Sequence, residues 1–178
     1  MYILLWVFFL YLYIQTLGLQ PNGSAPNIIL AALGVVDFGI HEISHIVFGF
    51  LPSIGVAAAG SIGEVSFTVL VTALAFKAKS YFAGIFGLVW VMIAMTDAGI
   101  YMADARTMQL HLVGPGTDPK HDWNYVFGQL GWLNADTVIG GTVRAIGDVL
   151  GAAGLLLGIV LIVGMLGNTK KEVSGYAK

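Results

Sequence analysis

Long apolar stretches separated by short polar breaks dominate this sequence. Most of them reach the roughly 20 residues that a helix needs to cross the hydrocarbon core of a bilayer. The pattern predicts about five transmembrane helices, at residues 3–18, 27–51, 54–76, 81–105 and 137–166, and an amphipathic segment at 121–133. We therefore expect an all-α integral membrane helical bundle in which residues 1–178 form a single transmembrane domain.

Composition strengthens this interpretation and narrows the chemistry. Hydrophobic residues make up 57% of the chain and charged residues only 10%, whereas a soluble domain carries about 25% charged residues. The chain has no cysteine, so disulfides and thiolate ligands are excluded, and a metal site must use His, Asp, Glu or water. The net charge of −2 and the lack of a long basic cluster argue against a nucleic-acid partner.

The positions of lysines set the expected orientation in a cell (inner) membrane. Lysine and arginine in short loops mark the cytoplasmic side of a membrane protein. The lysines concerned are Lys77 and Lys79 in one connection, and Lys170, Lys171 and Lys178 at the C-terminus. They predict a cytoplasmic C-terminus and, with five spans, an N-terminus outside. Residues 1–14 lack the basic start of a signal peptide, so we expect them to be retained as the first helix.

Ionisable residues inside the expected spans are the first indication of function. Each costs about 2.5–3.5 kcal/mol at the centre of a membrane helix by insertion scales, and such residues usually mark functional sites. They are Asp37, His41, Glu42, His45, Glu64, Asp97, Arg144 and Asp148. So many in a small bundle argue against a purely structural membrane module.

The segment His41-Glu42-Ile43-Ser44-His45 carries the main signal for chemistry. His41 and His45 are one helical turn apart and face the same way, so their imidazoles can hold one tetrahedral metal ion. Glu42 lies beside them, where it can act as the general base toward a water molecule activated by the metal. The pattern predicts one Zn²⁺ per chain.

A catalytic zinc takes three protein ligands, so a third residue must join the two histidines. At 1.5 Å per residue along the expected helices, Asp97 and Glu64 lie at the depth of the histidine pair. Asp104 and His121 lie at the outer end of the spans, from where they can fold back over the site. The residues alone leave all four open as the third ligand.

Three stretches together resemble a group of small prokaryotic integral membrane proteins of the zincin type. They are His41-Glu42-Ile43-Ser44-His45, the "ADAR" helix end in Tyr101 to Arg106, and the "HDW" element His121-Asp122-Trp123. The resemblance covers about residues 38–150. It implies His41, His45 and His121 as metal ligands, with Asp104 as a further ligand or as the residue that orients one.

A more distant similarity is to intramembrane metalloproteases of the site-2-protease type. Those carry HExxH within a membrane helix and a third, Asp ligand in a later helix, a segment that Thr96-Asp97-Ala98-Gly99 matches only in part. We expect a zinc-dependent hydrolase, foremost a metallopeptidase, with Glu42 as the catalytic base. The partners expected are the lipid bilayer and a membrane protein or lipid substrate. The alternatives are a lipid amide or ester hydrolase with the same zinc site, and a metal or proton transporter.

Overall fold

The computed structural model describes residues 1–21, 25–112 and 121–176, and side chains as far as Gly167. The described part is helical and contains no strand, which confirms the all-α fold. Its elements are α1 (Tyr2–Leu17), α2 (Ile28–Val47), α3 (Ser53–Lys77), α4 (Tyr81–Ala103), α5 (Asp122–Leu130), the short 3-10 helix η1 (Leu133–Ala135) and α6 (Asp136–Tyr176).

Four described helices are long and apolar enough to cross a membrane. They are α2, α3, α4 and the stretch Leu133–Gly167, most of which belongs to α6. The first helix, α1, has 16 residues, which gives it a length of about 24 Å, short of a hydrocarbon core of about 30 Å. The expected number of about five spans is therefore not confirmed, whereas four apolar helices are compatible with a multi-pass membrane protein.

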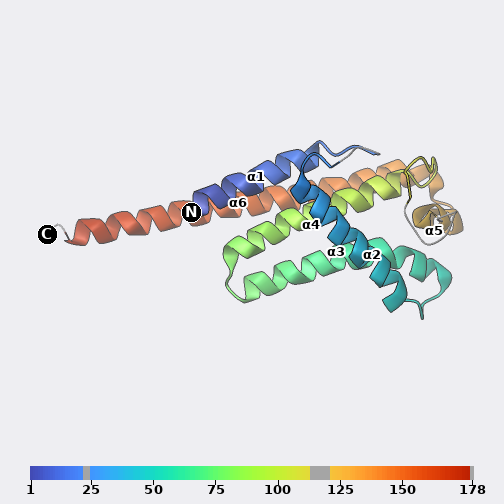
Figure 1. Cartoon of the computed structure of the whole chain (residues 1–178), viewed down its shortest axis with the longest axis horizontal. Coiled ribbons are helices and arrows are strands. Elements are labelled where there is room, and N and C mark those ends of the chain that lie inside the picture. The colour runs from blue at the N-terminus through green and yellow to red at the C-terminus, as the bar shows by residue number, and fades with distance from the viewer. Residues whose placement is uncertain (22–24, 113–120, 177–178) are drawn as a thin grey trace.

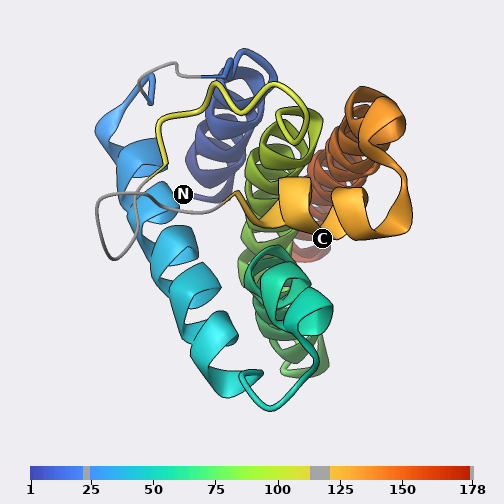
Figure 2. The same ribbon diagram turned by 90° about the vertical axis from the view of Figure 1, so that its right-hand side faces the viewer.

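Helix α4 forms the centre of the bundle. Helices α1, α3 and α6 pack against it, α2 lies obliquely against α3, and α5 crosses the end of the bundle beside α3 (Figures 1 and 2). Ile85, Val89 and Ile93 of α4 are almost completely buried and form one core with Phe9 and Leu12 of α1. A second, smaller core lies under α5.

Glycines let α6 lie directly against α4. A Cβ atom on Gly99 would approach the backbone oxygen of Gly140 and the Cγ atom of Arg144 to 2.6 Å, and one on Gly147 would lie 3.0 Å from Cβ of Met95. In membranes, small residues at a crossing allow such close backbone packing. Gly141 points elsewhere, because no atom lies within 4 Å of its Cβ position.

Two helix ends differ from the sequence expectation. The helix expected over 81–105 ends at Ala103, because the next carboxylate, that of Asp104, accepts hydrogen bonds of 2.9 Å from the amides of Gln109 and Leu110 and draws the chain into a turn. The last helix continues to Tyr176 instead of ending at 166. Polar residues end the apolar surface of a helix, but Lys and Glu are good helix formers and do not end the helix itself.

The two chain ends also differ from the expected topology. Helix α1 runs antiparallel to α6, since Trp6 Nε1 donates to the backbone oxygen of Leu155 at 2.8 Å and Arg144 donates to that of Leu19 at 3.3 Å. The start of α1 therefore lies toward the C-terminal half of α6, whereas the sequence placed the two termini on opposite sides.

Candidate metal centre

The two histidines of the HExxH segment project from α2 where it lies closest to α3. Their ring centroids are 4.8 Å apart, as expected for residues one helical turn apart. The imidazole of His41 lies directly over Gly60 of α3, where any Cβ atom would collide with the ring. Ser44 lies over Gly63 in the same way. These two glycines therefore bring α2 and α3 together and leave room for the His41 ring.

The Nδ1 atom of each histidine faces an acceptor on α3. His45 Nδ1 lies 2.8 Å from the backbone oxygen of Val56, and His41 Nδ1 lies 3.4 Å from Glu64 Oε2. Carbonyl and carboxylate oxygens only accept, so a proton on Nδ1 of each ring would satisfy these contacts and leave the Nε2 lone pair free for a metal ion. Metal-binding histidines usually have such a partner on the other ring nitrogen.

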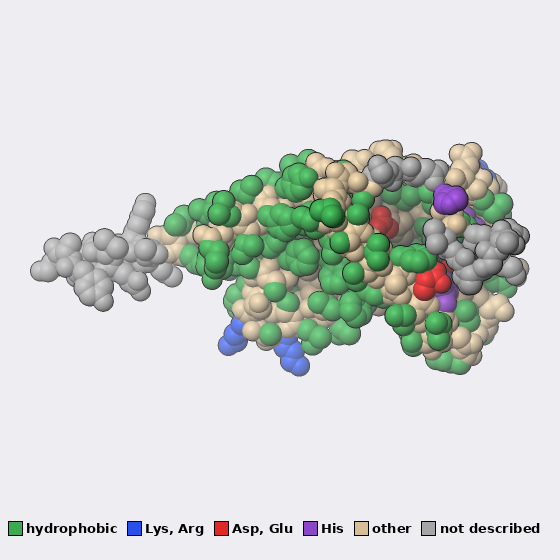
Figure 3. All heavy atoms as spheres, viewed as in Figure 1, with side chains coloured by type: hydrophobic (Ala, Val, Ile, Leu, Met, Phe, Trp, Pro, Cys, Tyr) green, Lys and Arg blue, Asp and Glu red, His purple; other side chains and the backbone are tan. Residues whose placement is uncertain are grey.

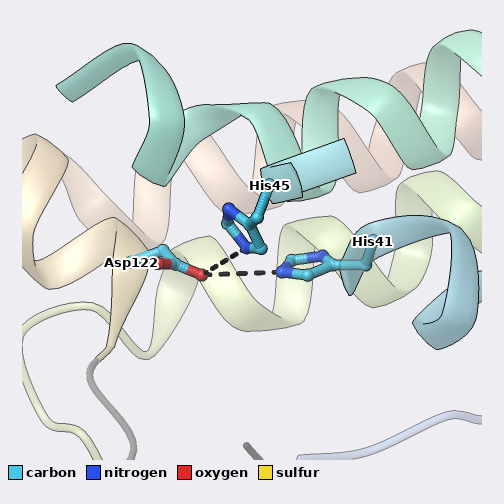
Figure 4. Close-up of side chains that lie close together, drawn as sticks. All are labelled: His41, His45 and Asp122. Atoms are coloured by element: carbon cyan, nitrogen blue, oxygen red, sulfur yellow. Dashed lines mark ion pairs between the residues drawn. The ribbon is translucent and has the colours of Figure 1, made fainter. Parts of the chain in front are cut away.

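Both Nε2 atoms converge on one carboxylate oxygen of Asp122, at the start of α5 (Figure 4). Asp122 Oδ2 lies 3.5 Å from His41 Nε2 and 3.3 Å from His45 Nε2. Zinc ligands at about 2.1 Å in a tetrahedral arrangement are about 3.4 Å apart. Among the described residues, His41, His45 and Asp122 are the group whose donor atoms, all within 4.8 Å of one another, could hold a metal ion.

Helix α5 is held in place by residues on both sides of Asp122. Trp123 Nε1 donates to Ser61 Oγ of α3 at 3.0 Å, and Asn124 Nδ2 donates to the backbone oxygen of Ala105 at 2.8 Å. His121 caps the helix, because its Nδ1 accepts a hydrogen bond from the Asn124 amide at 3.2 Å. The apolar face of α5, which includes Trp123, is buried in the smaller core.

The ligands expected from the resemblance fall into two groups in space. His121 Nε2 lies 3.4 Å from Asp104 Oδ2, apart from the group formed by His41, His45 and Asp122. Burial lowers the pKa of His121, although the nearby Asp104 carboxylate acts in the opposite direction. The neutral imidazole then keeps the Nδ1 lone pair that caps α5.

Asp104 organises the turn that follows α4. Burial alone would raise the pKa of its carboxyl group, but hydrogen bonds from Thr107 and from the amides of Gln109 and Leu110, together with nearby His121, outweigh burial and lower the pKa. The side chain of Asp104 is thus a buried carboxylate with several donors. It supports the turn and faces the residue that caps α5.

The buried acids have different positions relative to the centre. Glu64, which depth alone placed level with the histidines, contacts His41 through Nδ1 and not through Nε2, which faces Asp122. Asp37, one turn before His41, accepts a hydrogen bond of 2.8 Å from Trp90 Nε1. Asp97 on α4 is partly buried and lies outside the group of metal-facing atoms. Among these acids, Glu64 is the one that supports a histidine of the centre directly.

Glu42, the expected catalytic base, is partly buried and directly follows His41 on α2. Figure 3 shows an acidic and a histidine side chain side by side at the molecular surface where α2 meets α3. The HExxH end of α2 is accessible from outside the bundle, since His45 and Asp122 keep 21% and 22% of their side chains exposed.

Asp122 is the residue that the sequence reasoning did not select as a ligand, although it belongs to the "HDW" element. The "HDW" element was the only feature of the sequence that pointed to Asp122. Acidic residues are common in the first turn of helices for reasons unrelated to metals. Two imidazole nitrogens and one carboxylate oxygen fit zinc by donor type and spacing.

Comparison of the chain with models of protein families, with curated proteins and with solved structures finds no match.

Proposed function

We propose that this chain is a membrane-embedded, zinc-dependent hydrolase with His41, His45 and Asp122 as metal ligands. The observation that carries the proposal is the convergence of the two Nε2 atoms on Asp122 Oδ2, while both Nδ1 atoms face acceptors on α3. Three protein donors leave the fourth position of a tetrahedral site for water or substrate, as in catalytic zinc sites.

Other residues near the proposed zinc site act as the general base and hold the histidines in place. Bound zinc supplies a Lewis acid that polarises a carbonyl group and makes hydroxide available near neutral pH. Glu42 takes the proton from the attacking water and returns it to the leaving group. Glu64 and the Val56 carbonyl hold the two imidazoles in place, and burial between α2 and α3 strengthens these contacts.

The expected substrate is an uncharged carbonyl group, foremost a peptide bond, and the described cationic side chains are compatible with it. The two arginines of the described part have partners elsewhere, Arg106 with Asp136 and Arg144 with the Leu19 carbonyl. The lysine side chains that the structure describes, Lys77 and Lys79, lie at the α3–α4 turn, far from the histidines near α5 (Figure 3). Nothing described here provides the cationic clamp that a phosphate group requires. A lipid amide or ester remains compatible with the same zinc site.

The position of the centre along the bundle indicates from which side it works. It lies at the end of the bundle opposite the α3–α4 turn, which carries Lys77 and Lys79. If those lysines mark the cytoplasmic side, the centre faces the outer leaflet. The expected substrate is then a membrane protein or lipid that presents its carbonyl group at this depth.

The first test is the zinc content of detergent-purified protein by mass spectrometry. We expect near-stoichiometric zinc in the natural chain and in Glu42→Gln, and loss of zinc in His41→Ala and Asp122→Asn. His121→Gln tests the third ligand that the resemblance implies, and His111→Gln, at an exposed position, is the matched control. Zinc lost in His121→Gln but kept in Asp122→Asn would contradict the ligand assignment, and a natural chain without zinc would refute the hydrolase.

A measurement of substrate turnover distinguishes the role of Glu42 as a base from the role of the metal ligands. Cells with and without the chain are compared by proteomics and lipidomics, and the cleaved molecule then serves as substrate for the purified protein. Glu42→Gln should keep zinc and lose catalysis by about 10²-fold or more, the usual contribution of a general base. A Glu42→Gln variant with natural turnover would show that another group takes the proton.

A second candidate function is metal or proton transport, and the buried acids of the bundle favour it. Asp37 and Glu64 are almost fully buried, and each has one carboxylate oxygen without a partner among the described residues. Ionisable groups in such positions are typical of ion pathways. The test is flux in liposomes: metal-selective transport that is lost in Asp37→Asn would replace the hydrolase, and no flux would exclude transport.

A further inference from the structure

The third ligand of the proposed centre sits on a short helix outside the membrane spans. Helix α5 has nine residues, and Asp122 is its first. The contacts of Trp123 and Asn124 fix the position of the helix, but they do not touch the carboxylate itself. A ligand must lie within about 0.2 Å of its ideal distance to bind a metal well, so the orientation of this carboxylate matters as much as the position of α5.

Tyr101 of α4 contacts Asp122 in two ways with one hydroxyl group. The hydroxyl oxygen accepts a hydrogen bond of 2.9 Å from the Asp122 amide. The hydroxyl proton is directed to Asp122 Oδ2 at 3.3 Å, the oxygen that faces both histidines. One hydroxyl group thus contacts both the backbone amide and the carboxylate of Asp122. These two contacts restrict rotation of the Asp122 side chain.

The ring of Tyr101 is itself held between two imidazoles. Its centroid lies 6.1 Å from that of His41 and 4.4 Å from that of His121, the second contact being a tilted stack with an interplanar angle of 33°. Aromatic pairs at such distances stabilise a defined ring position. The hydroxyl group is thus fixed by packing and has little freedom to turn away from Asp122.

We propose that Tyr101 is a positioning residue for the third ligand and that its hydroxyl group sets the affinity of the centre for zinc. The proposal rests on the metal centre of the proposed function but not on hydrolysis. Among the described residues, the Asp122 carboxylate has His41, His45 and Tyr101 as its polar partners. Since the histidines would turn to the metal, Tyr101 is the partner that remains to orient the carboxylate.

The expected effect follows from the way metal sites depend on the groups that orient their ligands. Loss of such a group typically weakens metal binding by about 10- to 100-fold. Tyr101→Phe removes the hydroxyl group and keeps the ring that packs against His41 and His121. The Asp122 amide then loses its acceptor, and the carboxylate can rotate away from the two Nε2 atoms.

The experiment measures zinc affinity by chelator competition, and the visible spectrum of the Co²⁺-loaded protein, for full-length chains in detergent. Tyr101→Phe is compared with the natural chain, with Asp122→Asn as the reference for loss of the ligand. Tyr125→Phe, at an exposed position on the same helix α5, is the matched control. We expect about 10- to 100-fold weaker zinc binding in Tyr101→Phe, a cobalt spectrum shifted toward that of Asp122→Asn, and no change in Tyr125→Phe.

Two results would overturn the inference and leave the proposed function intact. One is natural zinc affinity in Tyr101→Phe. The other is weaker binding with an unchanged cobalt spectrum, because the coordination would then not depend on the hydroxyl group. A natural chain that binds neither metal refutes the zinc centre itself. Hydrogen exchange of metal-free protein then still tests the contact, since Tyr101→Phe should expose the start of α5 and Tyr125→Phe should not.

Discussion

A single methyl group on Gly60 tests the geometry of the metal centre from the side of α3. In Gly60→Ala the new Cβ atom would lie 2.6 Å from both Cδ2 and Cε1 of the His41 ring. Carbon atoms pack best at about 3.5–4.0 Å, so the ring must move by about 1 Å. In the metal-free protein it can rotate away, but in the metal-bound protein it must stay.

The cost therefore falls on the metal-bound state. Overpacking a well-packed site costs about 1–3 kcal/mol, which corresponds to about 5- to 150-fold weaker zinc binding. The assay is chelator competition with purified protein. The control is Gly39→Ala on α2, where no atom lies within 4 Å of the Cβ position. Natural zinc affinity in Gly60→Ala would refute the placement of His41 over Gly60, and equal weakening in Gly39→Ala would show a general effect on α2.

Two further predictions concern stability, measured by thermal unfolding in detergent. Asp104→Asn loses hydrogen bonds to a charged group and should be less stable by about 1–3 kcal/mol at neutral pH. The pKa of Asp104 is lowered in the folded protein. The stability difference between the natural chain and Asp104→Asn is therefore fully present above the ordinary pKa of about 4 and is lost as the pH falls through the lower pKa of the folded protein. A stability difference independent of pH would contradict this. Gly147→Leu should destabilise the α4–α6 packing by about 1–3 kcal/mol, because a Cβ atom there lies 3.0 Å from that of Met95. Gly141→Leu, with no neighbour within 4 Å, should not, and equal melting temperatures would contradict the packing.

The long apolar stretches were enough to predict the all-helical fold, and helical spacing was enough to predict how the two histidines meet. An apolar stretch of helical length in a chain with few charges has few other possible structures. His41 and His45 share a face of α2 because residues four apart do so in any α-helix. The prediction that is not confirmed is the span at α1, whose 16 residues are apolar but fewer than the roughly 20 that a span usually takes.

The position of Asp122, the proposed third ligand, could not be predicted from the sequence, because it depends on how α5 folds back. That placement is set by contacts between distant residues, such as Trp123 with Ser61, which are 62 positions apart. Glu64 lies at the depth of the histidines and does contact His41, but depth does not determine which ring nitrogen a carboxylate faces. In the "HDW" element, one residue caps the helix and the next one points at the histidines, and sequence spacing does not distinguish these roles.

The centre draws its donors from α2 and α5, which are separated along the chain by all of α3 and α4. During synthesis, α2 emerges and can insert long before Asp122 has been made. A nascent chain therefore offers two imidazoles but no complete site, and it gains the third donor only after α4 has been inserted and α5 has docked on α3. If the proposed centre binds zinc, tight metal capture would mark the completed protein, and truncated or misinserted chains would stay metal-free.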